Sequence, residues 1–209
     1  MPACILSTYT LYCKIHFNRQ EVGTEDAQLA SEVVKPLWRE WVETILWALV
    51  LALLIRTFVV QAFWIPSGSM LPTLQAGDRV LVAKFWNWFT TPSHGSVYVF
   101  KYPEDRSRDF IKRIIAVPGD TVDIKDGVVY VNGSPVSEPY VVYKDRYTLR
   151  PNKFYPTVPF TVPQDQFFAM GDNRPNSQDS RFWGYVPAKD IHGPAFFRYW
   201  PLTRIGLPH

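Results

Sequence analysis

An apolar segment in the first third of the chain is the strongest pattern in the sequence. Residues 45–55 read ILWALVLALLI, and after a polar interruption at Arg56 the apolar sequence FVVQAFWI continues to Ile65. Together the two runs supply the roughly 20 apolar residues that a membrane-spanning helix needs. Aromatic residues, which gather where membrane helices meet water, lie toward the two ends of the segment: Trp41, Trp47, Phe63 and Trp64. The pattern predicts a transmembrane helix and its lead-in over residues 37–65, and a buried helix of a soluble core is the alternative.

Charged residues around this segment leave its orientation open. An arginine in the middle of a bilayer costs on the order of 3 kcal/mol, but Arg56 can extend its charged end to the membrane surface if that surface lies about a turn beyond it. Lysine and arginine residues set the orientation of a membrane helix, and neither flank has a clear excess of them. Residues 1–36, which are polar in their second half, are expected to form an N-terminal tail.

After the apolar segment, apolar and polar residues alternate with a period of two, which is the pattern of half-buried strands. Three runs have this pattern: 78–85, 95–102 and 109–117. The sequence TVDIKDGVVYVNG then places Asp126-Gly127 between two alternating runs and Asn132-Gly133 after them, and both pairs are hairpin turn signals. Residues 134–163 are rich in Pro and Tyr and are expected to form short irregular strands and loops. We therefore predict a mostly β body with many short strands.

The composition excludes several classes of protein. The chain has 209 residues, a net charge of +3 and no long block of Lys or Arg, so nothing in it indicates a nucleic-acid partner. Its two cysteines, Cys4 and Cys13, precede the predicted body, which therefore has no disulfide framework and no cysteine nucleophile. The histidines have no spacing typical of metal ligands; they are His16, His94, His192 and His209. We expect no metal and no other cofactor.

The sequence WIPSGSMLPTL, residues 64–74, places a serine on a constrained loop directly after the apolar segment. A serine hydroxyl is a weak nucleophile that needs a neighbouring base. The G-x-S-x-G motif is absent around Ser69, and an S-x-x-K motif is absent because Pro72 stands three residues later. No histidine lies in a recognisable nucleophile motif either. A lysine can serve instead, provided that its surroundings keep it neutral.

The stretch DFIKRIIAV, residues 109–117, contains a lysine among apolar residues. Because alternate residues of a strand share a face, Lys112 is expected beside Phe110, Ile114 and Ala116. Burial disfavours the charged form of a lysine and lowers its pKa. A lysine on an apolar face is unusual, although a lysine that extends along an edge strand to solvent gives the same pattern.

The stretch MGDNRPNSQDSRFWG, residues 170–184, is dense in Asn, Asp, Ser and Arg. A solvated surface loop has this composition. A buried polar network that orients a reactive group has it too. The stretch alone does not distinguish the two.

In this order, the stretches IPSGSMLPTL, GDRVLVAKF, FIKRIIAVPGD and GDNRPNSQDSRFWG resemble the type I signal peptidases, which are membrane-bound serine proteases with a Ser/Lys dyad. The resemblance extends from the apolar segment to the C-terminus, and the four motifs in sequence are far more specific than any one of them. It implies a mostly β fold, in which a catalytic domain of coiled antiparallel sheets with a small second β lobe is preceded by one N-terminal transmembrane helix.

The resemblance also implies roles for individual residues. Ser69 matches the nucleophile and Lys112 the general base. Ser67 matches a side chain of the oxyanion hole, and Ser177 the serine that orients the lysine. Four further residues match ion pairs that brace the site: Asp179 with Arg181, and Asp172 with Arg113. Six match the walls of shallow pockets for small side chains: Ile65, Pro66, Met70, Leu74, Phe110 and Ile111.

The type I signal peptidases cut secretory preproteins after Ala-x-Ala-like sequences. The resemblance therefore implies secretory preproteins and the lipid bilayer as partners, with no nucleic acid and no metal. It implies a cytoplasmic tail at residues 1–36 and a single membrane span within residues 37–65. It also implies a catalytic domain at residues 66–209, with an inserted lobe around residues 121–165, on the extracytoplasmic side of the cell membrane.

Other interpretations of the same features are open. The main one is a membrane-anchored β domain that binds partners without activity, in which Ser69 and Lys112 are incidental. A self-cleaving repressor of the same fold carries a DNA-binding helix-turn-helix, whereas this chain has an apolar segment. Signal peptidases of the eukaryote-like type carry histidine at the position of Lys112, so the lysine argues against them.

Overall fold

The computed structural model describes residues 37–142 and 145–208, apart from the side chains of Leu37, Asn87 and Trp88. The predicted N-terminal tail, residues 1–36, lies outside the described residues. The chain divides into two compact units, Met1–Leu46 and Trp47–His209.

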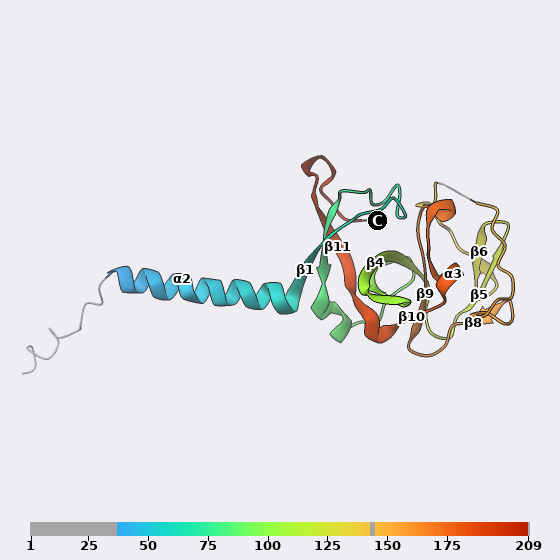
Figure 1. Ribbon diagram of the computed structural model, residues 1–209, viewed down its shortest axis with the longest axis horizontal. Coiled ribbons are helices and arrows are strands. Elements are labelled where there is room, and N and C mark those ends of the chain that lie inside the picture. The colour runs from blue at the N-terminus through green and yellow to red at the C-terminus, as the bar shows by residue number, and fades with distance from the viewer. Residues whose placement is uncertain (1–36, 143–144, 209) are drawn as a thin grey trace, which may run out of the picture. The chain divides into compact units, whose positions relative to one another are not determined.

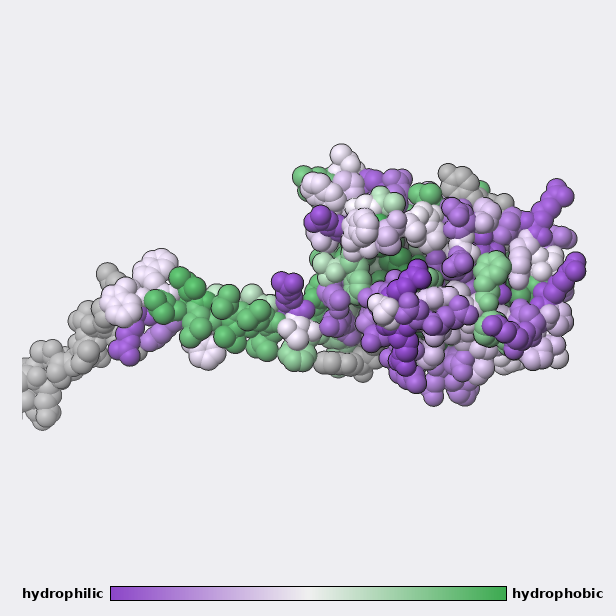
Figure 2. Space-filling model, viewed as in Figure 1, coloured by the Kyte–Doolittle hydropathy of each residue, from purple (hydrophilic) through white to green (hydrophobic). Residues whose placement is uncertain are grey.

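Helix α2 runs from Leu37 to Leu54, and a π-helical turn, η1 at Ile55–Val59, extends it (Figure 1). The stretch Trp38–Val59 has 22 residues with a mean hydropathy of 2.0, and none of its apolar window is buried inside the protein. Within the part of the chain that the structure describes, this is the one helix long and apolar enough to cross a membrane. Figure 2 shows hydrophobic residues over most of the visible surface of α2. A helix with unburied apolar residues along its length requires an apolar environment.

The segment after this helix is a strand, and the prediction that residues 60–65 continue the membrane helix is wrong. Strand β1 (Val60–Trp64) pairs antiparallel with strand β2 (Arg79–Ala83) along its full length. Its sequence is rich in the β-branched and aromatic residues that fit a pleated strand. Alternation then packs Phe63 against the core and leaves Trp64 exposed.

Over the described ranges, two antiparallel sheets form the body of the protein. The larger has the strand order β1-β2-β11-β3-β4-β9-β10, and its further strands are β3 (Val97–Tyr102), β4 (Asp105–Ala116), β9 (Gln166–Met170), β10 (Val186–Pro187) and β11 (Ile191–Trp200). The smaller has the order β7-β6-β5-β8, with strands β5 (Thr121–Lys125), β6 (Val128–Val131), β7 (Ser134–Pro135) and β8 (Phe160–Thr161). The short helical turns are η2 (Lys84–Trp88), η3 (Arg174–Asn176), α3 (Ser180–Trp183), η4 (Ala188–Asp190) and η5 (Leu202–Arg204). The predicted fold class is confirmed: a mostly antiparallel β body with a small second β lobe, preceded by an apolar helix.

The predicted strand runs and turns are present. The three alternating runs form β2, β3 and β4. Asp126 and Gly127 join β5 to β6 with φ angles of 47° and 78°, and Asn132 and Gly133 join β6 to β7 with φ angles of 53° and 78°. Asn-Gly and Asp-Gly are the pairs that best adopt positive φ at both central positions of a hairpin turn. These turns were therefore predictable from local sequence alone.

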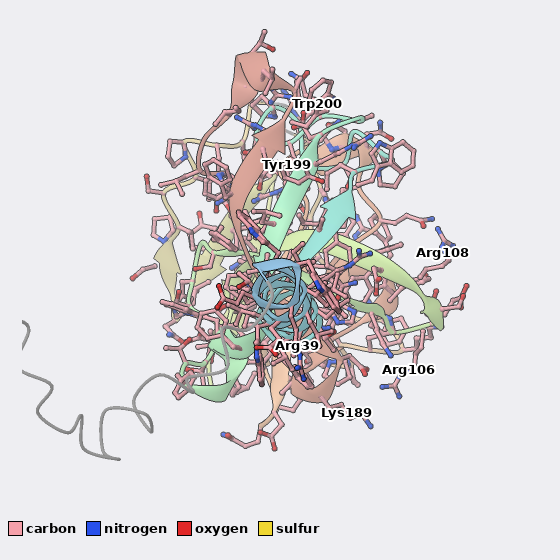
Figure 3. The ribbon with its side chains drawn as sticks, turned by 90° about the vertical axis from the view of Figure 1, so that its left-hand side faces the viewer. Arg39, Arg106, Arg108, Lys189, Tyr199 and Trp200 are labelled. Atoms are coloured by element: carbon pink, nitrogen blue, oxygen red, sulfur yellow. The ribbon has the colours of Figure 1, made fainter. Side chains whose placement is uncertain are left out.

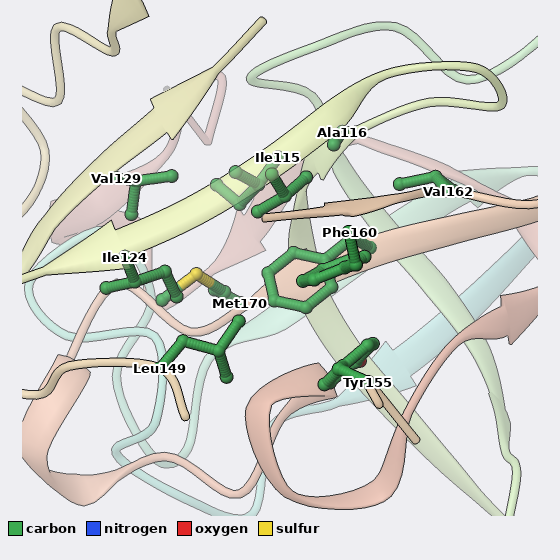
Figure 4. Packing of buried hydrophobic residues seen from close by; sticks show 11 residues of the cluster. Ile115, Ala116, Ile124, Val129, Leu149, Tyr155, Phe160, Val162 and Met170 are labelled. Carbon is green, nitrogen blue, oxygen red and sulfur yellow. The ribbon is translucent and has the colours of Figure 1, made fainter. Parts of the chain in front are cut away.

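A shared apolar core joins the two sheets. Ile115 of β4 and Met170 of β9 pack with Val122 and Ile124 of β5 (Figure 4). The buried ring of Tyr155, from the segment between β7 and β8, belongs to the same cluster. Because these side chains come from both sheets, the smaller sheet is stabilised by packing on the larger one.

We predicted that Lys112 shares one face of its strand with Phe110, Ile114 and Ala116. This arrangement agrees with the structure only as far as Ile114. Ile114 packs with Phe110 in one apolar cluster, but Ile115 and Ala116 both belong to the core shared with the smaller sheet. The pairing of β4 with β9 shifts register between Ile114 and Ala116. A bulge of this kind puts two consecutive side chains on one side of a strand. The predicted place of Ala116 beside Lys112 is therefore wrong.

Candidate active site

The loop that carries the candidate nucleophile is held in place by buried residues. The backbone N–H of Ile65 donates to the carbonyl of Asp78 at 2.9 Å, which closes the loop at its base. Met70 and Leu74 are both 0% exposed and pack in the apolar cluster beneath it. Ser69 directly precedes one of these anchors and lines a cleft. The position of its hydroxyl is therefore fixed by core packing.

Lys112 lies on β4, and its Nζ donates a hydrogen bond to the Oγ of Ser69 at 2.6 Å. The lysine is only 3% exposed. Burial is the largest influence on the pKa of Lys112 and lowers it to about 8, although the carboxylate of Asp179 acts in the opposite direction. Near pH 8 a substantial fraction of this amine is therefore neutral and can accept a proton.

Two further serines line the same cleft. The Oγ of Ser67 donates to the Oγ of Ser69 at 3.4 Å, a long contact. Ser177 is buried, and among the described residues its Oγ has no hydrogen-bond partner. It packs so closely against Gly171 that a Cβ added there would lie 2.2 Å from the Oγ. Ser177 is thus brought to the cleft without a hydrogen bond to Lys112, and its orienting role stays a prediction.

Two buried ion pairs join the four residues predicted to brace the site. Arg113 donates from Nε and Nη2 to the two oxygens of Asp172, at 2.9 and 2.6 Å. Arg181 donates from Nε and Nη2 to the two oxygens of Asp179, at 2.8 and 3.0 Å. Asp179 also caps α3 by accepting from the backbone N–H of Arg181. Bidentate ion pairs of this kind fix the orientation of both side chains.

A cleft of about 930 Å³ contains the serine and the lysine. Its lining comes from three parts of the chain: residues 66–69, residues 108–112 of β4, and residues 175–178 with Phe182. Arg108, one of the lining residues, is exposed and extends outward from the ribbon, as does Arg106 on the same strand (Figure 3).

The six predicted substrate contacts divide into two groups. Three of them line the cleft: Pro66, Phe110 and Ile111. The other three are fully buried in the apolar cluster below the serine loop and are not among the lining residues: Ile65, Met70 and Leu74. Their direct contact with substrate stays a prediction, and in this structure they support the loop.

Several polar residues that the sequence did not single out complete the site. The hydroxyl of Thr73 donates to Asp172 at 2.6 Å. Asn173 donates from its side chain to the carbonyl of Gly68 at 3.0 Å and from its backbone N–H to the carbonyl of Ser69 at 3.1 Å. The polar stretch 170–184 was the available signal for Asn173. A solvated loop is excluded for this stretch because all four of its charged residues are buried.

Two carboxylates from the segment between β7 and β8 also reach arginines of this site. Glu138 accepts from Arg174 at 2.9 and 2.5 Å, and Asp145 accepts from Nη1 of Arg181 at 2.9 Å. The sequence had no signal for either contact, because the partners are 36 residues apart and one of each pair lies in an irregular segment.

A hydroxyl beside a buried amine is an arrangement typical of serine hydrolases that use a lysine as base. Within the described ranges, no group of three or more His, Cys, Asp or Glu side chains is placed to hold a metal ion. The class of protein that the fold and the contact between Ser69 and Lys112 indicate is a β-rich serine hydrolase.

Comparison with known proteins identifies the family. The family model described as signal peptidase, peptidase S26, matches residues 38–200, and the chain belongs to this family. The "Probable signal peptidase I-1" of Synechocystis sp. is 45% identical over 175 residues, which cover 80% of this chain and 85% of that protein. "Signal peptidase I" of Leptolyngbya laminosa is 44% identical over 174 residues, 80% of this chain and 82% of that protein. The crystal structure of a signal peptidase I from Enterococcus faecalis is 31% identical and has a TM-score of 0.45, covering 50% of this chain and 97% of that one. The predicted family is confirmed.

Proposed function

We propose that this protein is a membrane-bound serine endopeptidase that removes N-terminal signal peptides from secreted preproteins after Ala-x-Ala-like sites. The observation that carries the proposal is the 2.6 Å hydrogen bond between Lys112 Nζ and Ser69 Oγ, both at the cleft. Membership of the signal peptidase family supports the reaction class, and the names of the relatives support the substrate class.

In the proposed reaction, neutral Lys112 takes the proton of the Ser69 hydroxyl while the oxygen attacks the scissile carbonyl. The lysine then returns the proton to the leaving amine, and a water molecule hydrolyses the acyl-enzyme by the same proton route. The hydroxyl of Ser67 and the backbone N–H of Ser69 stabilise the negative charge on the carbonyl oxygen. Removing one such donor typically costs about 3 kcal/mol of transition-state stabilisation. Ser177 orients the lysine.

The substrate is proposed to bind as an extended strand along β4. Pairing with β9 involves Arg113, Ile114 and Ala116, whereas residues 108–112 of β4 line the cleft. A free strand edge beside a cleft supports peptide binding by strand addition. Phe110 and Ile111 line the cleft together with Ser69, and bulky apolar walls favour small substrate side chains such as alanine.

The apolar stretch Trp38–Val59 is proposed as a single membrane span. Its 22 residues exceed the roughly 20 needed to cross the hydrocarbon layer. We infer a cytoplasmic tail at residues 1–36 and an extracytoplasmic catalytic domain that begins after the helix. An anchor in the same bilayer as the preprotein raises the effective concentration of the substrate.

The decisive experiment is cleavage of a preprotein with an Ala-x-Ala signal by wild type, Ser69→Ala and Lys112→Ala in detergent. Wild type should cut after the signal, and both variants should be inactive while remaining folded. Near-normal activity of Lys112→Ala would overturn the lysine mechanism, even though the family assignment stands. Protease protection of a C-terminal tag in sealed membrane vesicles tests the proposed orientation.

The competing function is a membrane-anchored β domain that binds partners without activity. An inert wild type, folded and tested on several Ala-x-Ala preproteins, would favour this reading. The buried contact between the serine and the lysine argues against it, because burying an amine costs stability and buried ionisable groups with shifted pKa values gather at functional sites.

A further inference from the structure

One short segment between β7 and β8 contacts two arginines of the site. Glu138 binds Arg174 with both carboxylate oxygens, at 2.9 and 2.5 Å. Tyr140 lies against Arg113, whose guanidinium carbon is 3.8 Å from the centre of the tyrosine ring. The hydroxyl of Tyr140 also donates to Oε1 of Glu138 at 3.2 Å. Because the two side chains contact each other as well as the arginines, we call residues 138–140 the clamp.

The contact with Arg174 is almost fully shielded from water. The Arg174 side chain is 2% exposed and that of Glu138 is 10% exposed. A buried guanidinium is stable only with a hydrogen-bonded counter-charge. Among the ion pairs of the described residues, Glu138 is the carboxylate that supplies it.

Each of the two arginines belongs to a chain segment that carries a residue of the proposed site. Arg174 donates from Nε to the carbonyl of Gly171 at 3.1 Å, and its own carbonyl accepts from Arg181 at 2.6 Å. It begins the helical turn η3, which ends immediately before Ser177. Arg113 follows Lys112 on β4. The clamp therefore touches the two chain segments whose relative position sets the site.

We propose that Glu138 and Tyr140 are positioning residues, which hold residues 171–177 against β4 and thereby fix Ser177 relative to Lys112. The proposal rests on the proposed function, since it concerns the same serine and lysine. Neither residue lines the cleft, so both act through the arginines and not through substrate. The second lobe, which has no part in the chemistry, thereby becomes part of what holds the active site together.

The groups that act on Lys112 explain what a loosened clamp would change. Asp179, Arg181 and Asp172 are the charged groups that influence its pKa, and the ring of Phe110 lies 5.6 Å from Nζ. The three charged residues all follow Gly171 in the chain. Burial is the dominant influence and lowers the pKa of Lys112, so admitting water beside the amine raises it.

The test compares Glu138→Gln and Tyr140→Leu with wild type, as full-length protein in detergent, for kcat and KM on a signal-peptide substrate across pH. We expect kcat to fall about tenfold or more while KM stays within about twofold of the wild-type value. The acidic limb of the pH–rate profile should move to higher pH by roughly half a unit. Tyr140→Phe, which keeps the ring against Arg113, should have a kcat close to that of wild type.

Asp123→Asn is the matched control. Asp123 lies in the same lobe, its side chain is also 10% exposed, and it pairs at 2.7 Å with Lys125, away from the site. This variant also loses a carboxylate of an ion pair, but its kcat and its acidic limb should equal those of wild type. Thermal unfolding of each variant gives its folded fraction at the assay temperature. Each rate can then be expressed per folded molecule.

Three results would overturn the proposal. The first is an unchanged kcat in both Glu138→Gln and Tyr140→Leu. The second is a loss of activity that only tracks loss of folded protein, with the acidic limb unmoved. The third is a limb that moves to lower pH, because that is the direct charge effect of an unpaired Arg174. Ser69→Ala and Lys112→Ala in the same assay distinguish failure of the positioning proposal from failure of the proposed function. If both are inactive while the clamp variants are normal, only the positioning proposal fails. If Lys112→Ala is active, the lysine mechanism fails, and if wild type is inert, the proposed function fails.

Discussion

Lys112 and Arg113 are neighbours on β4 and have opposite electrostatic surroundings. The guanidinium of Arg113 binds both oxygens of Asp172, whereas burial lowers the pKa of Lys112 to about 8. Consecutive side chains of a strand point to opposite faces. One strand therefore presents a permanent charge to a carboxylate on one face and a proton-accepting amine to Ser69 on the other.

The first prediction concerns the pH dependence of cleavage. Because Lys112 must be neutral to act as base and its pKa is about 8, kcat/KM should rise about tenfold per pH unit below that value and level off above it. Initial rates of preprotein cleavage between about pH 6 and about pH 9.5 measure this limb. Lys112→Arg, which stays protonated throughout, should be inactive at every pH. A flat profile, or an active arginine variant, would contradict a lysine base.

The second prediction concerns stability. Burial lowers the pKa of Lys112 to about 8 in the folded protein, from 10.5 for an unperturbed lysine. Between these values the unfolded chain binds more protons, so stability rises with pH in this window. Below it, the buried lysine costs on the order of 3 kcal/mol. Lys112→Met should therefore be inactive but harder to unfold with urea at pH 7, and this gain should shrink as the pH approaches 10.5.

Ser69→Ala is the control for this stability measurement, because it removes the nucleophile and keeps the lysine. Its stability should rise with pH over the same window as in wild type. Equal stability of Lys112→Met and wild type at every pH would mean that the lysine is not desolvated.

The third prediction concerns the pair of Arg113 and Asp172. Asp172→Asn leaves a buried guanidinium without its counter-charge and should lower the free energy of unfolding by about 3–5 kcal/mol. Replacing both partners, as in Arg113→Met with Asp172→Leu, should restore much of the stability, since no uncompensated charge is left. Urea denaturation of Arg113→Met, Asp172→Leu and the double variant measures the coupling. A double variant no more stable than Asp172→Asn would show that the pair is not the cause.

The fourth prediction concerns Gly171. A Cβ at this position would lie 2.2 Å from Ser177 Oγ and 2.5 Å from the carbonyl oxygen of Ser69. Gly171→Ala should therefore displace the serine loop or Ser177 and lower kcat by at least about 100-fold, the scale seen when catalytic groups are misplaced by an ångström. Rates on a signal-peptide substrate measure the loss.

Gly119→Ala is the matched control for the glycine prediction. Gly119 has a φ of 90° and open space where a Cβ would lie. Its substitution should cost about 1 kcal/mol of stability through backbone strain and leave kcat unchanged. Similar kcat values for the two alanine variants would show that the close contact at Gly171 is unimportant.

The elements that could be predicted from the sequence are those that depend on residues close together in the chain. The hairpins at Asp126-Gly127 and Asn132-Gly133 were predictable because few residue pairs adopt two positive φ angles. The apolar helix was predictable because its composition persists over many turns. The end of that helix was not, since the strand that follows is also apolar, and only its pairing with β2 distinguishes the two.

Long-range pairing accounts for most of what the sequence could not predict. Arg113 and Asp172 were matched through a family resemblance, but the contact of Glu138 with Arg174 joins an irregular segment to a polar loop, and neither segment has a pattern that points to the other. The bulge beyond Ile114 also depends on long-range pairing, because it arises from a register shift where β4 pairs with β9. Charged residues inside a protein are specified by partners distant in sequence, so periodicity alone cannot identify them.

In the larger sheet, one strand joins the part next to the Ser69 loop to the part that carries Lys112. β11 is the last strand that the structure describes in chain order, yet it lies between β2 and β3. The loop with Ser69 connects β1 and β2, and Lys112 lies on β4, which pairs with β3. Residues 191–200 therefore join the strands next to the Ser69 loop to the strands that carry Lys112. Two side chains that meet at 2.6 Å thus lie on strands that are joined by a segment following both of them in the chain.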